Sequence, residues 1–504
     1  MSAIEEGFVL KEHLPALIVV VPMVVAAAVA MTRNNRVAWA ASTIVTWALF
    51  VFSAMLLAEV TNVGEISYSL GGWPPPYGIE YRVDIVNALI LMLVSGIGAV
   101  VMPYALRAVD KDIHAGMHPW FYCTYLLCLC GLLGMTVTGD AFNIFVFMEI
   151  SSLATYVLIA LGRRREALLS AYQYLVMGTI GATLYVIGVG LLYIVTGSLN
   201  LSDIAGRLGP AMSDHSRSVM AGIAFIFTGL SLKLALFPLH FWLPNAYAFA
   251  PSFATIFLAA TATKVAIYVF LRLYFSVFGA AISFSQFPVV EVILVLSLAA
   301  IFTASFLAIY EDSIVRMLAY SSVAQIGYIT LGVAIANKAG LTGSIVHLVN
   351  HGLMKALLFA AVGAIIFRVG TDKLSKISGL GFKMPVTTAA FVVGGLSIIG
   401  VPSTVGFVSK WYLGVGAVNA GLWPVTLAIM VSSLLAVLYI GRVIEVVYFN
   451  PVCERCVKVK EPPLSMLAPI ILLAIATVYF GLDTSFTGDI AIKAAEQLLE
   501  GLKQ

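Results

Sequence analysis

Apolar runs long enough to cross a membrane follow one another along nearly the whole chain, and this feature limits the possible folds most. A helix that spans a bilayer needs roughly 20 mainly apolar residues. The runs cover residues 14–31, 37–58, 84–106, 119–138, 141–161, 170–196, 218–249, 252–276, 287–309, 314–336, 342–367, 384–412, 425–449 and 464–482. The pattern predicts an all-α polytopic membrane protein with about 14 transmembrane helices.

The composition excludes the other broad classes. Only 11% of the 504 residues are charged and 61% are hydrophobic, whereas a soluble domain carries about 25% charged residues. A net charge of +3 provides no basic face for nucleic acid, and this apolar content excludes disorder. We therefore expect the lipid bilayer to surround most of the chain, and no nucleic-acid partner.

The distribution of Lys and Arg predicts the orientation of the chain. Sixteen of the 28 lie in predicted loops on one side of the membrane, and eight lie on the other side. Cytoplasmic loops are enriched in these residues, so we expect both termini to be extracytoplasmic, in the cell (inner) membrane. Glu5 and Glu6 precede the first run, whereas a cleavable signal peptide starts with basic residues. We therefore expect that run to remain in the mature protein.

The other four lysines lie inside predicted spans: Lys233, Lys264, Lys355 and Lys410. A lysine at the bilayer centre costs roughly 2.5–3.5 kcal/mol. A lysine near a helix end can extend its amine to the membrane surface, but Lys264 and Lys355 lie about half a helix from either end of their runs. Ionisable groups at this depth usually mark proton or ion pathways, and we interpret all four lysines as proton carriers.

Glu149 is the deepest acidic residue, near the middle of the run 141–161. A buried carboxylate needs a proton or a cationic partner. A purely structural Glu–Lys pair is the alternative interpretation, but it would account for one lysine and not for four. Desolvation favours the neutral form of an amine, so buried lysines can accept and release protons in turn.

His347, His351 and Lys355 follow one another at i, i+4 and i+8, which places them on one face of a helix. Two histidines at this spacing could bind a metal ion, but no third ligand is evident and no glutamate lies between them. We therefore expect no metal and favour a proton relay. His240, between Pro238 and Pro244, is a further relay candidate.

Two of the predicted helices are interrupted by proline. Lys233 lies one to two turns before Pro238, and Lys410 lies two turns after Pro402. A break at membrane depth is stable only where protein or water satisfies the freed backbone groups. Broken helices at corresponding positions of two halves are typical of inverted-repeat transporters, and here each one carries a lysine.

Several segments resemble the antiporter-like proton-translocating family, which comprises large membrane subunits of respiratory complex I, energy-converting hydrogenases and Mrp-type multisubunit cation/proton antiporters. The resemblance covers nearly the whole chain. It rests on residues 138–149, 233–251, the helix around Lys264, 319–327 and 347–355.

The resemblance implies a fold of 14 helices with two five-helix inverted repeats, each containing a broken helix. In this chain the N-terminal helices would occupy residues 1–110 and the first repeat residues 119–276. The second repeat would occupy 287–449, and the last helix and C-terminal tail 464–504.

The family's residue roles also carry over by position. The resemblance implies that Glu149 pairs with Lys233, that Lys264 is the central lysine, and that Lys410 ends the path. His347, His351 and Lys355 match the family's histidine-bearing helix. One complex I subunit type has Glu where this chain has Lys410, which argues against that type.

Residues 72–79, followed by Asp84, are most similar to the D-subunit branch of the Mrp-type antiporters. We therefore expect a proton-translocating subunit of a Na⁺/proton antiporter, bound to homologous and small membrane subunits of a hetero-oligomeric complex. The alternative is a proton-pumping membrane subunit of a redox complex, either complex I or an energy-converting hydrogenase.

We expect no cofactor in the chain itself. The sequence has no cysteine pattern for an iron–sulfur cluster and no dinucleotide-binding fingerprint, so an oxidoreductase label would describe the complex and not this chain. Cys453 and Cys456 lie in a predicted cytoplasmic loop, where we expect a reduced, unliganded pair.

Overall fold

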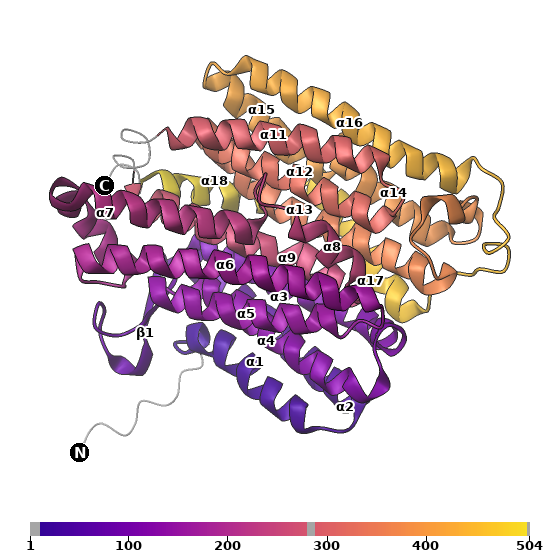
Figure 1. Cartoon of the computed structure of the whole chain (residues 1–504), viewed down its shortest axis with the longest axis horizontal. Helices are drawn as coiled ribbons and strands as arrows, with labels where there is room; N and C mark the ends of the chain where they lie inside the picture. The colour runs from indigo at the N-terminus through magenta and orange to yellow at the C-terminus, as the bar shows by residue number, and fades with distance from the viewer. Residues whose placement is uncertain (1–10, 280–287, 501–504) are drawn as a thin grey trace.

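The computed structural model describes residues 11–279 and 288–500, and helices account for nearly all of this part of the chain (Figure 1). The helices lie side by side in one bundle, from α1 and α2 at one side to α15 and α16 at the other. Their bounds are α1 Leu14–Met31, α2 Asn35–Val63, α3 Ile85–Asp112, α4 His118–Val137, α5 Ala141–Ala160, α6 Arg165–Thr196, α7 Leu201–Leu234, α8 Trp242–Phe249, α9 Ser252–Leu271, α11 Val289–Tyr310, α12 Ile314–Ile335, α13 Lys338–Val369, α14 Pro385–Ile399, α15 Val405–Asn419, α16 Trp423–Tyr448, α17 Leu464–Leu482 and α18 Ser485–Glu500.

The prediction of an all-helical membrane protein is confirmed, since each of the 14 predicted runs is a helix or a broken pair of helices. Within the described residues, 13 helices are long and apolar enough to cross a membrane. The run 218–249 divides into the end of α7 and the short α8, and the run 384–412 divides into α14 and α15.

The helices that carry the deepest lysines lie inside the bundle. In α9 with its following turn, and also in α12, 94% of the most apolar 18-residue window is buried, against 28% in α17 and 39% in α1. Helix α9 packs on α13 and on α3. Side chains on the inner faces of α9 and α13 are therefore surrounded by protein and not by lipid.

At each of the two breaks, other groups of the protein form hydrogen bonds with backbone atoms that the interrupted helix leaves without a partner. Ala235 ends α7 with a φ of 58°, and the Trp242 indole Nε1 donates to the Leu232 carbonyl at 3.0 Å. Gly400 ends α14 with a φ of 90°, and the chain turns through Pro402 before α15 begins. The carbonyls of Ile398 and Ile399 at the end of α14 accept from Lys410 Nζ. Both breaks are thus satisfied within the protein, as membrane depth requires.

Some elements were not predicted from the sequence. Strands β1 (Ile66–Ser69) and β2 (Glu80–Val83) form a short antiparallel hairpin, and α18 follows the last span. The hairpin and α18 lie at the same end of the bundle (Figure 1). Four-residue strands are too short to show an alternating pattern, and α18 is amphipathic, so neither produces a long apolar run.

The expectation of a reduced cysteine pair was wrong for this structure. Cys453 and Cys456 are joined in a disulfide. Their separation of three positions brings the Cα atoms to 5.1 Å, which lies within the range that a disulfide allows.

Candidate functional site

The four lysines singled out in the sequence are all buried, each on a different helix. Lys233 lies on α7, Lys264 on α9, Lys355 on α13 and Lys410 on α15. Lys264 and Lys355 have no exposed surface. Four amines within a lipid-embedded bundle need polar partners, and those partners define the site.

Lys264 lies at the centre of the group. Its Nζ donates to the Ala259 carbonyl at 2.5 Å and to the Thr263 hydroxyl at 3.3 Å. It also interacts electrostatically with His347, His351 and Lys355 across the contact between α9 and α13. A proton on any of these groups therefore changes the energy of a proton on the others.

The two histidines stack as their spacing predicts. The ring centroids of His347 and His351 are 6.1 Å apart and the rings are nearly parallel, at 13°. His347 lies between the Ser409 hydroxyl, 2.7 Å from Nδ1, and the Gln325 amide oxygen, 2.9 Å from Nε2. Neither ring nitrogen of the buried His351 has a hydrogen-bond partner in the described part of the chain.

Lys355 extends toward α12. Its Nζ donates to the Leu318 carbonyl at 2.8 Å and to the Ser321 hydroxyl at 2.5 Å, and it lies 5.8 Å from the centroid of the Phe359 ring. These partners are neutral. The Lys355 amine can therefore lose or gain a proton without separating an ion pair.

Lys410 lies against the end of the broken helix α14. Its Nζ donates to the carbonyls of Ile398 and Ile399 at 3.0 and 2.9 Å and to the Ser433 hydroxyl at 2.8 Å. The last carbonyls of a helix have no partner in the helix and carry its negative dipole end. The break at Pro402 thus creates a site for the positive charge of Lys410, which also interacts electrostatically with His347.

Lys233 and Glu149 approach each other without a direct contact. Lys233 Nζ donates to the Ser152 hydroxyl at 2.5 Å, and Ser152 lies one turn after Glu149 on α5. Glu149 is half-buried and interacts electrostatically with Lys233, but its Oε1 has no partner among the described residues. Ser152 thus holds the Lys233 amine near Glu149, where the predicted Glu149–Lys233 pair would form.

A cavity of about 30 Å³ adjoins Lys233 and is lined partly by Ala262 and Ala266 of the Lys264 helix. This volume is enough for one or two water molecules. The cavity therefore lies between the two lysine-bearing helices at a place where water can connect them.

His240 lies in the break after α7, between the rings of Phe237 and Phe241 at centroid distances of 5.3 and 4.9 Å. It is buried, and its Nδ1 has no partner in the described ranges. Within these ranges no contact joins it to the buried lysines. The structure does not bring His240 together with the other candidates.

Comparisons with known proteins show the family of this chain. Residues 138–436 match the family described as NADH:quinone oxidoreductase/Mrp antiporter, TM. The chain belongs to this family. The matched range contains every candidate site residue from Glu149 to Lys410.

Individual relatives cover nearly the full length. The NADH-quinone oxidoreductase subunit N of Desulforudis audaxviator is 41% identical, over 93% of this chain and 96% of the relative. The D subunit of the Na(+)/H(+) antiporter of Bacillus subtilis is 30% identical, over 93% of each chain. A chain of the Mrp complex from Dietzia sp. DQ12-45-1b superposes with a TM-score of 0.88 at 26% identity, over 98% of both chains.

The family segment 319–327 gains a structural role that the sequence did not predict. Ser321 holds Lys355, and Gln325 holds His347, both from α12. Serines and a glutamine within an apolar span are a readable signal, since buried polar groups need partners. Their partners become visible only when α12 and α13 are packed together.

Proposed function

We propose that this chain is the proton-translocating subunit of a multisubunit Na⁺/proton antiporter, with protons moving along the buried Glu149–Lys–His axis. The observation that supports this most is that the lysines and histidines are buried together on neighbouring helices inside the bundle. His347 and His351 stack on α13, and Ser409, next to Lys410 on α15, lies 2.7 Å from His347 Nδ1. The antiporter relative from Bacillus subtilis, which is similar over 93% of this chain, supports Na⁺ as the cation that is exchanged for protons.

The mechanism is charge switching. When Glu149 approaches Lys233, the carboxylate stabilises the ammonium; at an effective dielectric of about 20, a pair at 4 Å is worth roughly 4 kcal/mol. When the pair opens, as in the conformation with Lys233 on Ser152, the proton is released toward Lys264. It then passes along His347, His351 and Lys355 to Lys410.

Each lysine has neutral partners suited to both charge states. Hydroxyls and carbonyls at Lys264, Lys355 and Lys410 accept from an ammonium, and a hydroxyl can also donate to a neutral amine. Loss of the proton therefore leaves no buried carboxylate unpaired.

We place the protein in the cell (inner) membrane, with both termini extracytoplasmic and with homologous and small membrane subunits around it. The two-to-one excess of Lys and Arg in the predicted cytoplasmic loops supports this orientation. The half-buried position of Glu149 supports a neighbouring subunit beside α5.

A second function is supported by a specific observation. The 41% identical relative is named NADH-quinone oxidoreductase subunit N, which favours a proton-pumping subunit of a redox complex. The buried axis is common to both functions.

Measurements of proton flux in membrane vesicles that contain the intact complex distinguish the antiporter function from the redox-pump function. Na⁺ added without an electron donor should drive proton movement if the complex is an antiporter, and Lys264→Ala should abolish it. Proton movement that requires an electron donor and does not depend on Na⁺ would show that the chain is a proton-pumping subunit of a redox complex. Flux that is independent of Lys264 in both assays would refute the proton-carrying role.

A further inference from the structure

Helix α12 presents one polar face to the relay, and the last residue of that face has no role in the function proposed above. Ser321, Gln325 and Tyr328 follow at i, i+4 and i+7, which places them on one side of the helix. Ser321 accepts from Lys355, and the Gln325 amide oxygen lies 2.9 Å from His347 Nε2. The polar face therefore follows the relay from one end of the group toward Tyr328.

The Tyr328 ring adjoins both His347 and Lys410. Its centroid lies 5.6 Å from that of the His347 ring, and Lys410 Nζ lies over the Tyr328 ring at 4.8 Å from the centroid. The tyrosine is buried, with 2% of its surface exposed. An ammonium within about 6 Å of the face of an aromatic ring is attracted by it, most strongly where water is excluded. The ring therefore stabilises the charged form of Lys410.

The ring completes a site for the ammonium of Lys410. Three acceptors surround Nζ: the carbonyls of Ile398 and Ile399 and the Ser433 hydroxyl. An ammonium has three N–H donors, so it fills all three hydrogen bonds. The Tyr328 ring adds an attraction that does not use a hydrogen bond. The site thus fits the charged amine better than the neutral one.

Two adjacent serines of α16 hold the ring and the amine. The Ser432 hydroxyl donates to the Ile429 carbonyl at 2.9 Å. It has a single hydrogen, so it accepts from the Tyr328 hydroxyl, 2.5 Å away. Ser433, the next residue, lies 2.8 Å from Lys410 Nζ. One turn of α16 therefore sets the position of the ring relative to the amine.

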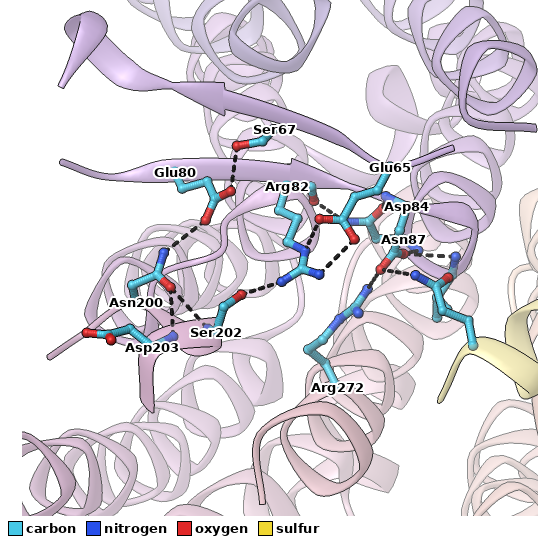
Figure 2. A network of polar contacts seen from close by, with 12 residues as sticks. Glu65, Ser67, Glu80, Arg82, Asp84, Asn87, Asn200, Ser202, Asp203 and Arg272 are labelled. Atoms are coloured by element: carbon cyan, nitrogen blue, oxygen red, sulfur yellow. Dashed lines mark hydrogen bonds and ion pairs between the residues drawn. The ribbon is translucent and has the colours of Figure 1, made fainter. Parts of the chain in front are cut away.

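Another buried cation of the chain is bound in a different way (Figure 2). Arg272 Nη2, in the turn after α9, lies 2.6 Å from Asp84 Oδ2, and 12% and 1% of the two side chains are exposed. A carboxylate partner favours the charged form of a cation strongly. Within the described ranges no ion pair includes Lys410. Aromatic and neutral partners attract its ammonium and still allow the amine to lose its proton.

We propose that Tyr328 is a positioning residue for the last step of the relay. Its ring retains the Lys410 ammonium at the end of α14 until the proton leaves, and Ser432 holds the ring in place. The inference rests on the proposed function. The titratable groups that face Lys410 are Tyr328 from α12 and, through Ser409, His347 from α13. The partners from α14 and α16 are carbonyls and a hydroxyl, which stay neutral.

Substitutions at position 328 test this role in vesicles of the intact complex, with assembly checked for each variant. Tyr328→Phe keeps the ring and removes the hydroxyl, so flux should stay within about threefold of wild type. Ser432→Ala removes the same hydrogen bond from the other side and should match it. Tyr328→Leu removes the ring and should slow flux by about tenfold. Its half-maximal flux should lie about one pH unit lower, because the ammonium then needs a higher proton concentration to form.

A comparison that preserves the shape of the ring removes the attraction without making a cavity. Pentafluorophenylalanine incorporated at position 328 has nearly the shape of phenylalanine, but its fluorine atoms withdraw the negative charge from the ring face. It should reproduce the slower flux and the shifted pH profile of Tyr328→Leu, while Tyr328→Phe keeps the wild-type profile. This comparison decides the question even if Tyr328→Leu fails to assemble.

Tyr104→Leu is the matched control, because Tyr104 on α3 is as deeply buried but packs near Gly363 and not near Lys410. It leaves a cavity of similar size and should not move the pH profile. An unmoved profile with pentafluorophenylalanine at position 328 would overturn the inference. Flux that is blocked in Lys410→Ala but has the wild-type rate and profile in all variants at position 328 would refute this inference alone. Wild-type flux in Lys410→Ala would instead contradict the proposed function.

Discussion

At the residue scale, the site consists of amines held mainly by neutral groups. Lys355 binds a carbonyl and a serine, and Lys410 binds two carbonyls and a serine. A permanent carboxylate partner would keep each lysine protonated. The neutral partners explain how the described spans can contain four buried lysines with Glu149 as the acidic residue near the middle of a span.

The sequence predicted the depth of these residues but not their partners. Charge within an apolar run identifies Lys264, and helical spacing identifies the stack of His347 and His351. Gln325 and Ser409 could not be assigned to His347, because they come from helices whose packing the sequence does not specify. The contact of Lys233 with Ser152 in place of Glu149 depends on one side-chain conformation, which sequence spacing does not determine.

The first prediction concerns Glu149 and Lys233. Glu149→Ala or Lys233→Ala should reduce proton flux by about 100-fold or more, because each removes a group that holds or releases the proton. Ser152→Ala is the matched control and should be mild, since water can replace a hydroxyl. The measurement is flux in vesicles with complex assembly checked separately, and near-normal flux in assembled Glu149→Ala would contradict the coupling.

The second prediction compares histidines with lysines. His347→Gln and His351→Gln should each slow flux by about tenfold or less, because water can bridge one missing relay group, whereas Lys355→Ala should cost ~100-fold or more. Initial rates in the same vesicles measure the difference. Equal losses in all three variants would show that the histidines are as essential as the lysine.

At the element scale, the two proline breaks were predictable and the hairpin and α18 were not. Proline removes a backbone donor wherever it occurs in a helix, so Pro238 and Pro402 are readable from sequence alone. The interior position of α9 and α12 was not predictable from the sequence. Nearly all spans are apolar, and the burial of each span depends on which helices pack around it. The two five-helix repeats stay a prediction. Each of the two predicted repeats contains one of the breaks.

The third prediction concerns the packing of α6 on α7. A Cβ at Gly188 would lie 2.5 Å from the Gly222 carbonyl, while nothing lies within 4 Å of one at Gly190. Gly188→Leu should therefore destabilise the protein by about 1–3 kcal/mol, as overpacking does, and Gly190→Leu should be close to neutral. Thermal unfolding of the purified complex measures this, and equal losses in both variants would contradict the packing.

At the scale of the whole molecule, the bundle places one charged axis inside a protein that has no large soluble part among its described residues. The described loops are short, and Glu149 is half-buried on α5. In the proposed function the axis moves the proton but does not by itself provide a driving force. That force would come from cation or electron transfer in other subunits of the complex.

The fourth prediction follows from this arrangement. The purified chain, reconstituted alone into liposomes, should show no Na⁺/proton exchange, while the intact complex in the same liposomes should. The dye signal of internal pH after a Na⁺ pulse measures both. Robust exchange by the chain alone would show that coupling does not need partners.

The central claim is that Lys264 and Lys410 carry the transported proton, and one measurement tests it most directly. Proton flux is measured across a range of pH in vesicles that contain assembled Lys264→Ala, Lys410→Ala or Lys410→Glu complexes. We expect both alanine variants to block transport and Lys410→Glu to retain part of it with an altered pH dependence, because a carboxylate also titrates. Near wild-type flux in both alanine variants would show that these lysines are structural and that the axis is wrong.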